Sequence, residues 1–291
     1  MNETANEIGS QPDCWRTAVG MAKASDADLP HHGQTVAAVG CGTSLFVSRA
    51  YAVLREASGN GVTDAFAASE FPEGRGYDRV VAITRSGTTT EVLRLMGGRD
   101  PASLVVITAD AGAPAASMAA ARVVVDFADE RSVVQTRFPT TVLALLRTHL
   151  GEDLAGAIAD AERAMDASFP VDPDAIDHIV FLGHGWTVGI AEEAALKMRE
   201  AARMHSEAYP AMEYRHGPIS VAGPRSLVWI LGTADDAVAD DARETGAAVH
   251  AATFDPMAEL VLIQRFAVAV AAARGLDPDR PRHLTRSVIL S

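Results

Sequence analysis

The stretch Thr35–Ala57, TVAAVGCGTSLFVSRAYAVLREA, decides the fold class of this 291-residue chain. It opens with the apolar run VAAVG, which is typical of a buried strand, and a glycine-rich turn follows directly. The remainder has the apolar spacing and the length of a helix. A strand that enters a helix through a glycine turn is the building unit of α/β sheets, so the stretch predicts at least one such unit.

The same order of features recurs later in the chain, in His178–Tyr214, HIVFLGHGWTVGIAEEAALKMREAARMHSEAYPAMEY. Aligning Gly40 with Gly183 also aligns Gly42 with Gly185 without a gap. Each copy is followed by a further strand-like segment, RVVAITRS in the first and SLVWILGT in the second. Self-similarity on this scale indicates two copies of one structural unit.

Because strands alternate with helices in both copies, we expect parallel sheets covered by helices. The predicted fold class is α/β, with two tandem doubly wound parallel-sheet domains of flavodoxin-like or Rossmann-like topology, related by a pseudo-two-fold axis. The expected boundaries are an N-terminal helical segment at residues 1–35, a first domain at 36–150, a helical connector at 151–170 and a second domain at 171–291.

Composition narrows the class of protein. The chain is 48% hydrophobic, and its formal net charge of −13, without a cluster of lysine and arginine, argues against a nucleic-acid partner. The N-terminus has no apolar signal core, and LVLIQRFAVAVAAA at Leu260–Ala273 is interrupted by Gln264 and Arg265 and is predicted to be too short for a membrane span. Cys14 and Cys41 have no metal-ligand spacing. We therefore expect a reduced, cytoplasmic protein with no membrane partner.

The stretch Ala82–Val92, AITRSGTTTEV, is the first candidate for a functional site. An apolar strand ends in the hydroxyl-rich segment Thr84–Thr89, and a segment with helical spacing follows. Free N–H groups at a helix N-terminus, the helix dipole and hydroxyl side chains together favour an anion, although a serine- and threonine-rich helix cap without a ligand is the alternative. The second copy carries Asp235 and Asp236 at this place, and these would repel a phosphate. Anion binding is therefore predicted for the first half only.

The second candidate is a charged helix in the other copy. Glu193, Lys197 and Glu200 lie at i, i+4 and i+7, so one helix face carries all three. A solvated face with ordinary ion pairs is the alternative. The helix begins at the carboxyl end of a strand, where open α/β sheets bind ligands, and it leads to His216 in RHGP. A carboxylate with a nearby histidine suits proton transfer, and since the histidine and glutamate spacing fits no known metal motif, we expect no metal site.

These motifs resemble the SIS (sugar isomerase) domain family, in particular the isomerase half of glucosamine-6-phosphate synthase and stand-alone amino-sugar-phosphate isomerases and deaminases. The resemblance runs over nearly the whole chain, through GCGTS, ASEF, ITRSGTT, QTRFPTT, EEAALKMREAARMHSEAYPAMEYRHGP and DRPRHLTRSVIL. The block that ends in HGP is the most specific of these motifs. The resemblance implies tandem SIS domains that bind a sugar phosphate and need no cofactor.

The resemblance also implies roles for single residues. Glu200 matches the base that removes the proton at C2, and Lys197 and Glu193 match the residues beside it. His216 matches a histidine of ring opening that relatives contribute across a dimer interface, so a homodimer is implied. The residues implied to bind the phosphate and the sugar are Cys41, Gly42, Thr43, Ser44, Thr84, Arg85, Ser86, Gly87, Thr89 and Gln135.

Two departures from the family limit what the resemblance implies. Asn2 stands where a glutaminase domain would carry its cysteine nucleophile, so we expect no release of ammonia from glutamine by this chain. Arg286 aligns with the family's tail lysine; it cannot form a Schiff base, but it could hold O1 of an enolate as a hydrogen-bonding cation.

The expected function is that of an enzyme that abstracts the C2 proton of glucosamine-6-phosphate or its N-acetyl form. Isomerisation, with or without deamination, is the first hypothesis. A dehydratase that eliminates the 3-hydroxyl of N-acetylglucosamine-6-phosphate, a carbon–oxygen lyase, is the alternative within enzymes. A catalytically silent sugar-phosphate sensor is the alternative from another class.

Overall fold

The computed structural model describes residues 2–232 and 236–290, so Asp235 and the side chain of Asp236 lie outside the described part of the chain. The chain divides into two compact units, each named here by the sheet it contains. The first-sheet unit comprises Asp13–Arg131, Arg137–Leu154 and Thr285–Ser291. The second-sheet unit comprises Met1–Pro12, Ser132–Thr136 and Ala155–Leu284. The four boundaries that the sequence predicts stay a prediction, and the units differ from them mainly at the two chain ends.

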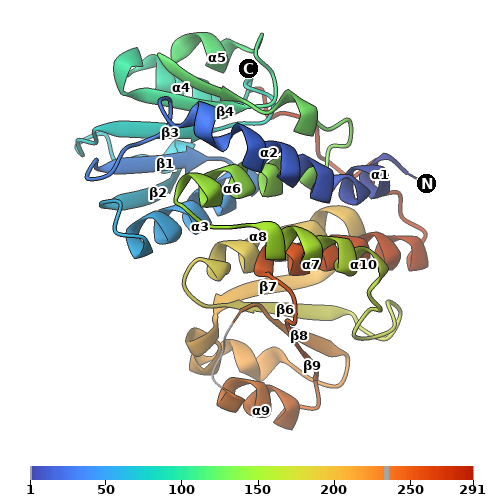
Figure 1. Ribbon diagram of the computed structural model, residues 1–291. Coiled ribbons are helices and arrows are strands. Elements are labelled where there is room, and N and C mark those ends of the chain that lie inside the picture. The colour runs from blue at the N-terminus through green and yellow to red at the C-terminus, as the bar shows by residue number, and fades with distance from the viewer. Residues whose placement is uncertain (1, 233–235, 291) are drawn as a thin grey trace. The chain divides into compact units, whose positions relative to one another are not determined.

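The first-sheet unit contains a five-stranded sheet of order β2-β1-β3-β4-β5 (Figure 1), in which all pairs are parallel. The strands are β1 (Val36–Gly40), β2 (Thr63–Ala67), β3 (Arg79–Ile83), β4 (Leu104–Thr108) and β5 (Ala121–Val124). The helices are α2 (Gln11–Ser25, of which the first two residues group with the other unit), α3 (Thr43–Ala57), α4 (Thr90–Gly97), α5 (Pro114–Met118) and α6 (Arg137–His149), with the short 3-10 helices η1 (Ala68–Glu70), η2 (Pro101–Ser103) and η3 (Asp126–Ala128).

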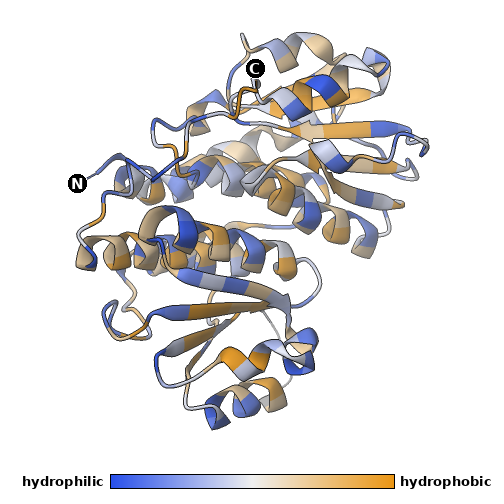
Figure 2. Cartoon of the chain, turned by 180° about the vertical axis from the view of Figure 1, so that it is seen from behind, coloured by the Kyte–Doolittle hydropathy of each residue, from blue (hydrophilic) through white to orange (hydrophobic). Residues whose placement is uncertain are grey.

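The central strands of this sheet are buried on both faces because their side chains are apolar in both directions. Every residue of β1 and of β4 is buried, and Figure 2 shows largely apolar strands in this sheet. α3 packs against α6 and α4 packs against α5. Helix pairs that cover a parallel sheet in this way give a doubly wound unit.

The strand order places a ligand-binding crevice at the carboxyl ends of β1 and β3. β1 pairs with β2 on one side and with β3 on the other, so the chain leaves β1 in one direction and returns on the opposite side. At such a switch point the loops after the two central strands diverge and leave room for a ligand. These loops are the glycine turn after β1 and the hydroxyl-rich segment after β3, the two segments that the sequence predicts to bind phosphate.

The second-sheet unit contains a four-stranded parallel sheet of order β7-β6-β8-β9. Its strands are β6 (His178–Gly183), β7 (His205–Pro210), β8 (Ser226–Ile230) and β9 (Ala248–Ala251). Its helices are α1 (Glu3–Gly9), α7 (Ala155–Asp166), α8 (Thr187–Ala202), α9 (Asp236–Glu244) and α10 (Pro256–Ala273), with the 3-10 helices η4 (Ala211–His216) and η5 (Pro218–Val221). α10 packs against α1, α7 and α8, whereas α9 contacts β9 and η4.

The repeat found in the sequence is a repeat of structure. A Cβ on Gly40 would lie 2.6 Å from atoms of Ser44, and a Cβ on Gly183 would lie 2.4 Å from the backbone of Thr187. In both units the first turn of the following helix therefore crowds the end of the strand. The next glycines, at positions 42 and 185, have φ values of 54° and 56°. Both turns need glycine for the same two reasons, a close backbone approach and a left-handed conformation. The prediction of two α/β parallel-sheet units is confirmed.

The apolar segment near the C-terminus forms a longer helix than the sequence analysis expects. α10 begins at Pro256 and has 18 residues, which by length and composition alone would suffice to cross a membrane. The expectation that the segment is too short is therefore wrong. In the structure 67% of this helix is buried, as in the core helix of a globular unit.

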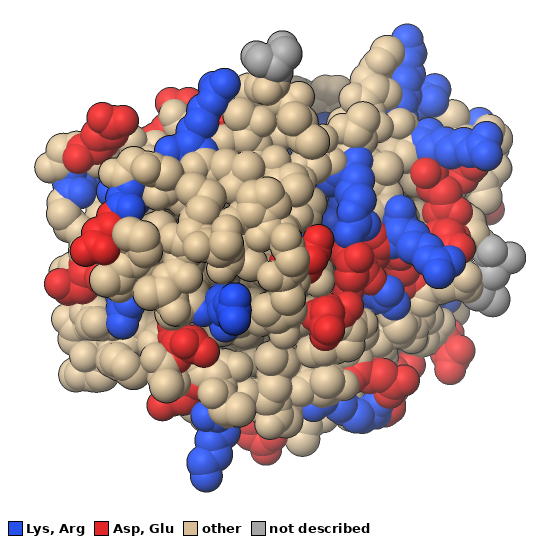
Figure 3. All heavy atoms as spheres, turned by 90° about the horizontal axis from the view of Figure 1, so that it is seen from above, with Lys and Arg blue, Asp and Glu red and all other residues tan. Residues whose placement is uncertain are grey.

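The face of the molecule in Figure 3 carries basic side chains interspersed with acidic ones. Several are paired at the surface, as are Arg225 with Asp177 and Arg243 with Asp240, both at 2.7 Å. On that face, among the described residues, no broad basic surface of the kind that binds nucleic acid is present.

Candidate functional site

The hydroxyl-rich loop Thr84–Thr89 connects the carboxyl end of β3 to α4. The Ala115 N–H donates to the Gly87 carbonyl at 3.1 Å, which holds the loop against the start of α5. Gly87 has a φ of 61°, and a Cβ there would lie 2.4 Å from the Cβ of Ala113. A side chain at this position would therefore be strained and would collide with its neighbour. The backbone of the loop is fixed before any ligand binds.

Helix capping does not account for the hydroxyls of this loop. Thr89 is the N-cap residue of α4, yet its side chain makes no capping hydrogen bond. The nearest partner of its hydroxyl is the Ser287 hydroxyl, at 3.4 Å. The alternative of a simple serine- and threonine-rich cap is thus not what the structure contains, and the positive end of the α4 dipole lies beside hydroxyls that do not cap it.

The turn after β1 forms the second part of this candidate site. Thr43 and Ser44 begin α3, and their side chains are buried. Burial, and next to it the charge of Glu91 in the first turn of α4, raises the pKa of the Cys41 thiol to about 11. The influence of Glu91 places this turn close to the start of α4. At neutral pH Cys41 is a protonated thiol and not a nucleophile.

The C-terminal tail lies across the loop (Figure 1), within the first-sheet unit. The Thr90 N–H, the first of α4, donates to the Val288 carbonyl at 3.2 Å, and the Leu290 N–H donates to the Thr90 hydroxyl at 2.9 Å. The Thr88 hydroxyl donates to the Ser287 hydroxyl at 3.0 Å. Tail atoms thus engage the donors that a bound anion would use.

Two arginines of the predicted site are held by one acidic segment. Arg85 is buried and pairs with Glu130 at 3.5 Å, while its other guanidinium nitrogen donates to the Arg286 carbonyl at 3.1 Å. Arg286 in turn pairs with Asp129 at 2.5 Å and donates to the Glu130 carbonyl. The structure therefore brings Arg286 to the hydroxyl-rich loop of its own unit. The roles of Arg85 at the phosphate and of Arg286 at O1 stay predictions.

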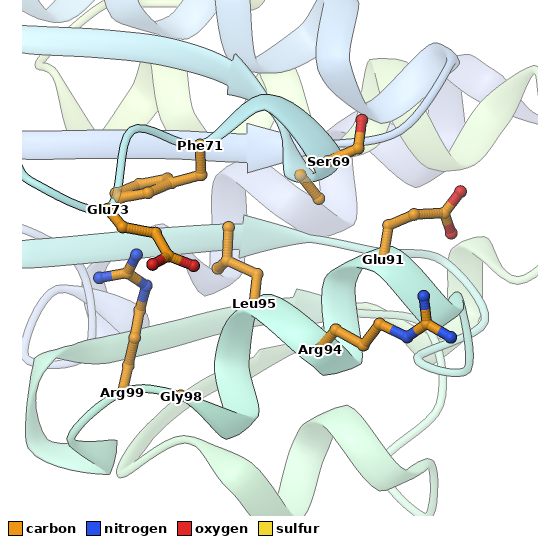
Figure 4. A pocket seen from close by; sticks show the side chains of 9 residues that line it. Ser69, Phe71, Glu73, Glu91, Arg94, Leu95, Gly98 and Arg99 are labelled. Atoms are coloured by element: carbon orange, nitrogen blue, oxygen red, sulfur yellow. The ribbon is translucent and has the colours of Figure 1, made fainter.

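A cavity of about 600 Å³ opens in the same unit between η1 and α4 (Figure 4). Its charged side chains come in opposite signs, Glu73 and Glu91 against Arg94 and Arg99, and Arg99 lies 3.9 Å over the ring of Phe71. The ASEF motif of the sequence analysis forms one wall. The cavity includes none of the residues predicted to bind the phosphate, and Glu91 is its link to the Cys41 turn.

The second candidate site lies on α8 of the second-sheet unit. Lys197 is within 3.3 Å of a Glu193 carboxylate oxygen and 2.5 Å of a Glu200 oxygen. The side chains of Lys197 and Glu193 are 1% and 2% exposed, and that of Glu200 is 18% exposed. A solvated helix face, the alternative in the sequence analysis, is excluded by this burial. One cation between two carboxylates leaves a net charge of −1, and Glu200 is the member that solvent reaches.

The other predicted members of the site lie in different segments of the same unit. His216 ends η4 with an exposed side chain, and within the described residues it makes no hydrogen bond or ion pair. Gln135 carries a buried Oε1 that accepts no hydrogen bond from any described residue. Neither residue contacts the Glu200 carboxylate within the described part of the chain.

One group among the described residues has the composition of a metal site. His178, His205 and Glu207 bring two imidazoles and a carboxylate together at the amino ends of β6 and β7. The sequence analysis considered only His205 with Glu207, and it missed His178, which precedes them by a whole helix.

Sequence reasoning also missed the residues that hold the two arginines and the tail. Asp129, Glu130 and Ser287 contact predicted site residues, yet they belong to none of the motifs that suggested a role. The only signal is the pair of adjacent acidic residues shortly before QTRFPTT. The partners of that pair could not be read from the sequence.

Comparison with known proteins places these two sites in a family context. A family model of the SIS domain matches residues 175–241. A glutamine–fructose-6-phosphate aminotransferase of Sulfolobus acidocaldarius is 25% identical over 301 residues, covering 90% of this chain and 51% of the relative. The corresponding aminotransferase of Gloeobacter violaceus is 36% identical over 144 residues, covering 40% of this chain and 24% of the relative. The chain thus spans about half, or less, of the length of these curated relatives.

Solved structures share the fold over almost the whole chain. A glucosamine-6-phosphate deaminase from Thermotoga maritima is 23% identical, with a TM-score of 0.79 and coverage of 99% of this chain and 100% of the other. The C-terminal domain of a glucosamine-fructose-6-phosphate aminotransferase from Francisella tularensis is 20% identical, with a TM-score of 0.81 and coverage of 96% and 98%. A tagatose-6-phosphate ketose/aldose isomerase from Escherichia coli is 18% identical, with a TM-score of 0.78 and coverage of 100% and 96%. With its family match in the second-sheet unit and this two-sheet fold, the chain belongs to the SIS domain family.

Proposed function

We propose that this chain is an enzyme that acts on an amino-sugar 6-phosphate, glucosamine-6-phosphate or its N-acetyl form, by abstracting the proton at C2. The observation that carries the proposal is the buried cation of Lys197 between Glu193 and Glu200. Burying three charges costs free energy, and a helix whose task was only structural would gain more from apolar residues of similar size. The names of the aminotransferase, deaminase and isomerase relatives support this substrate class.

In the proposed mechanism Glu200 is the base. Lys197 donates a hydrogen bond to one carboxylate oxygen of Glu200 and so orients the carboxylate, while the other oxygen remains for the substrate. Glu193 compensates the second part of the Lys197 charge. The triad therefore presents one net negative charge, and removal of a proton from C2 neutralises it without leaving a buried carboxylate unpaired.

Phosphate binding is proposed for the loop after β3 and the turn after β1. The hydroxyls of Thr43, Ser44, Ser86 and Thr89 and the N-terminus of α4 supply donors for phosphate oxygens. Binding energy at the phosphate, remote from C2, orients the sugar. Because the Val288 carbonyl already accepts from the α4 N-terminus, we propose that the tail shifts when the phosphate binds.

The remaining predicted roles complete the site. Arg286 holds O1 as the C1–C2 enediolate forms, and its guanidinium can donate to that oxygen while Asp129 fixes its other edge. We propose a homodimer in which His216 of one subunit serves ring opening in the other. The exposed side chain of His216 is available for such a role.

Proton NMR in D₂O tests the reaction with each sugar phosphate separately. Exchange of the C2 proton with a ketose signal is the expected result, and Glu200→Gln, which keeps the shape of the side chain, should abolish it. A vinylic signal from the N-acetyl sugar would replace the isomerase by a dehydratase. Binding of both sugars without any exchange would reject catalysis and leave a sensor.

A subunit-mixing experiment tests the role of His216. Glu200→Gln and His216→Ala subunits are each expected to be inactive alone. If His216 acts across the interface, the mixed dimer has one intact site, and random exchange should restore roughly a quarter of the wild-type activity. No restoration, with subunit exchange shown by native mass spectrometry, would place His216 in the site of its own chain.

A further inference from the structure

We propose that His178, His205 and Glu207 of the second-sheet unit form a binding site for a divalent transition metal of the Zn²⁺ class. The site is separate from the residues proposed for catalysis, because it lies at the amino end of the sheet whereas α8 begins at the carboxyl end of β6. It does not depend on the proposed reaction. It also reverses the expectation from sequence spacing that no metal site is present.

Strand register brings the three residues together. In the parallel pair of β6 and β7, His178 lies opposite His205 and Val180 lies opposite Glu207. Residues two apart on a strand point to the same face, so His205 and Glu207 share a face of β7 with His178 beside them on β6. Because His178 belongs to another strand, the cluster has no spacing signature in the sequence.

The distances fit a shared ion. One potential ligand atom from each of the three residues lies within 4.8 Å of the other two. The His178 Nε2 and a Glu207 carboxylate oxygen are 2.9 Å apart, close to the separation of about 3.3 Å expected for two ligands of one tetrahedral zinc. His205 is exposed, so its ring can rotate to bring its nitrogen closer.

Neighbouring groups hold two of these ligands as the outer groups of a metal site do. The His178 Nδ1 lies 2.9 Å from the Ser226 hydroxyl, and the Tyr209 hydroxyl donates to the second Glu207 oxygen at 2.9 Å. With Nε2 on a metal, the Nδ1–H would donate to Ser226. Outer hydrogen bonds of this kind fix the orientation of the ligands and raise metal affinity.

A hydrogen bond between one histidine and one glutamate would not need the third residue. The rings of His178 and His205 have centroids 5.2 Å apart, and two imidazolium cations at that distance would repel each other. Two neutral imidazoles that share a cation with a carboxylate avoid the repulsion and use every member of the cluster. Two nitrogens and one oxygen are the donors that zinc and its neighbours in the first transition row prefer.

The site is accessible and has room for a further ligand. His178 and His205 line an open cavity of about 600 Å³, together with Asp177 and Ser226. Three protein ligands leave a fourth tetrahedral position for water. A bound ion would fasten the start of β7 to β6, and β7 is the edge strand that leads from α8 to η4.

Metal titration of the tag-free, chelator-treated full chain tests the proposal. We expect one Zn²⁺ per chain by calorimetry and, with Co²⁺, the visible absorption of a tetrahedral or five-coordinate ion. His205→Ala, which removes an exposed side chain, and Glu207→Gln, which keeps the shape of the side chain, should each weaken Zn²⁺ binding by at least tenfold. The control is the double variant His31→Ala/His32→Ala, two exposed histidines of the first-sheet unit, which should bind as the wild type does.

The outcomes separate cleanly. No stoichiometric binding by the wild type, or equal affinity in the His205 and Glu207 variants, would overturn the proposal. Loss of binding in the His31/His32 control would assign the metal to the surface pair instead. Because neither His205 nor Glu207 is proposed to touch the sugar phosphate, absence of sugar chemistry would leave the metal result standing, and the reverse also holds.

Discussion

The triad on α8 allows a demanding test of whether its charges are buried. Lys197→Met replaces the cation by an apolar side chain of similar length and leaves Glu193, 2% exposed, without its neighbour at 3.3 Å. At an effective dielectric constant of about 20, a pair of charges at this distance interacts by roughly 5 kcal/mol. Part of this is offset because the lysine no longer has to be desolvated. We therefore expect the variant to lose about 3–5 kcal/mol of the free energy of unfolding, the range for breaking a buried pair.

The assay is urea unfolding followed by the fluorescence of Trp229, which is fully buried in the same unit. The double variant Glu193→Gln/Lys197→Met removes both partners of the buried pair, and it should regain most of the loss. The matched control is Arg243→Met, which breaks an exposed i,i+3 pair of the same unit and should change stability by no more than about 0.5 kcal/mol. A loss of less than about 1 kcal/mol in Lys197→Met would refute the reasoning, since that is the size expected for a solvated face.

Three further predictions concern the first-sheet unit. Because burial and the charge of Glu91 raise the pKa of Cys41 to about 11, Glu91→Gln should lower that pKa, and alkylation by iodoacetamide at alkaline pH, followed by mass spectrometry, should become faster than in the wild type; an unchanged rate would contradict the proximity. Gly87→Ala should destabilise the unit by about 1–3 kcal/mol and weaken phosphate binding, because the φ of 61° and the neighbouring methyl group both oppose a side chain; a melting temperature and phosphate affinity equal to wild type would count against this account. Truncation of residues 285–290 should accelerate hydrogen exchange at the Thr90 amide, whose acceptor is in that tail, and unaltered exchange would show that the contact does not persist in solution.

Local requirements made much of the fold predictable. The glycines after β1 and β6 are needed where they stand because the following helix crowds the strand and the turn is left-handed, and these needs depend on a few neighbouring residues. The repeat in the sequence therefore predicted the repeat in the structure. The one length that failed was that of α10, because its first turn before Leu260 carries Pro256 and Glu259 and is not part of the apolar run.

The candidate sites were predictable only as far as one helix or one loop extends. Spacing on α8 placed Glu193, Lys197 and Glu200 on one face, but whether that face is buried depends on what packs against it. The burial of Lys197 between α8 and its neighbours follows from tertiary packing, and periodicity alone could not separate it from a solvated ion pair.

By itself the sequence determined the α/β class, the two glycine turns, the hydroxyl-rich loop before a helix and the charged face of α8, since each is set by residues within a few turns of one another. Tertiary structure alone decided that Arg286 meets Asp129, that the tail crosses the start of α4, and that His178 joins His205 and Glu207. These contacts join distant segments through strand register and chain topology. Register and topology arise from the packing of whole sheets, and no short stretch of sequence carries that information.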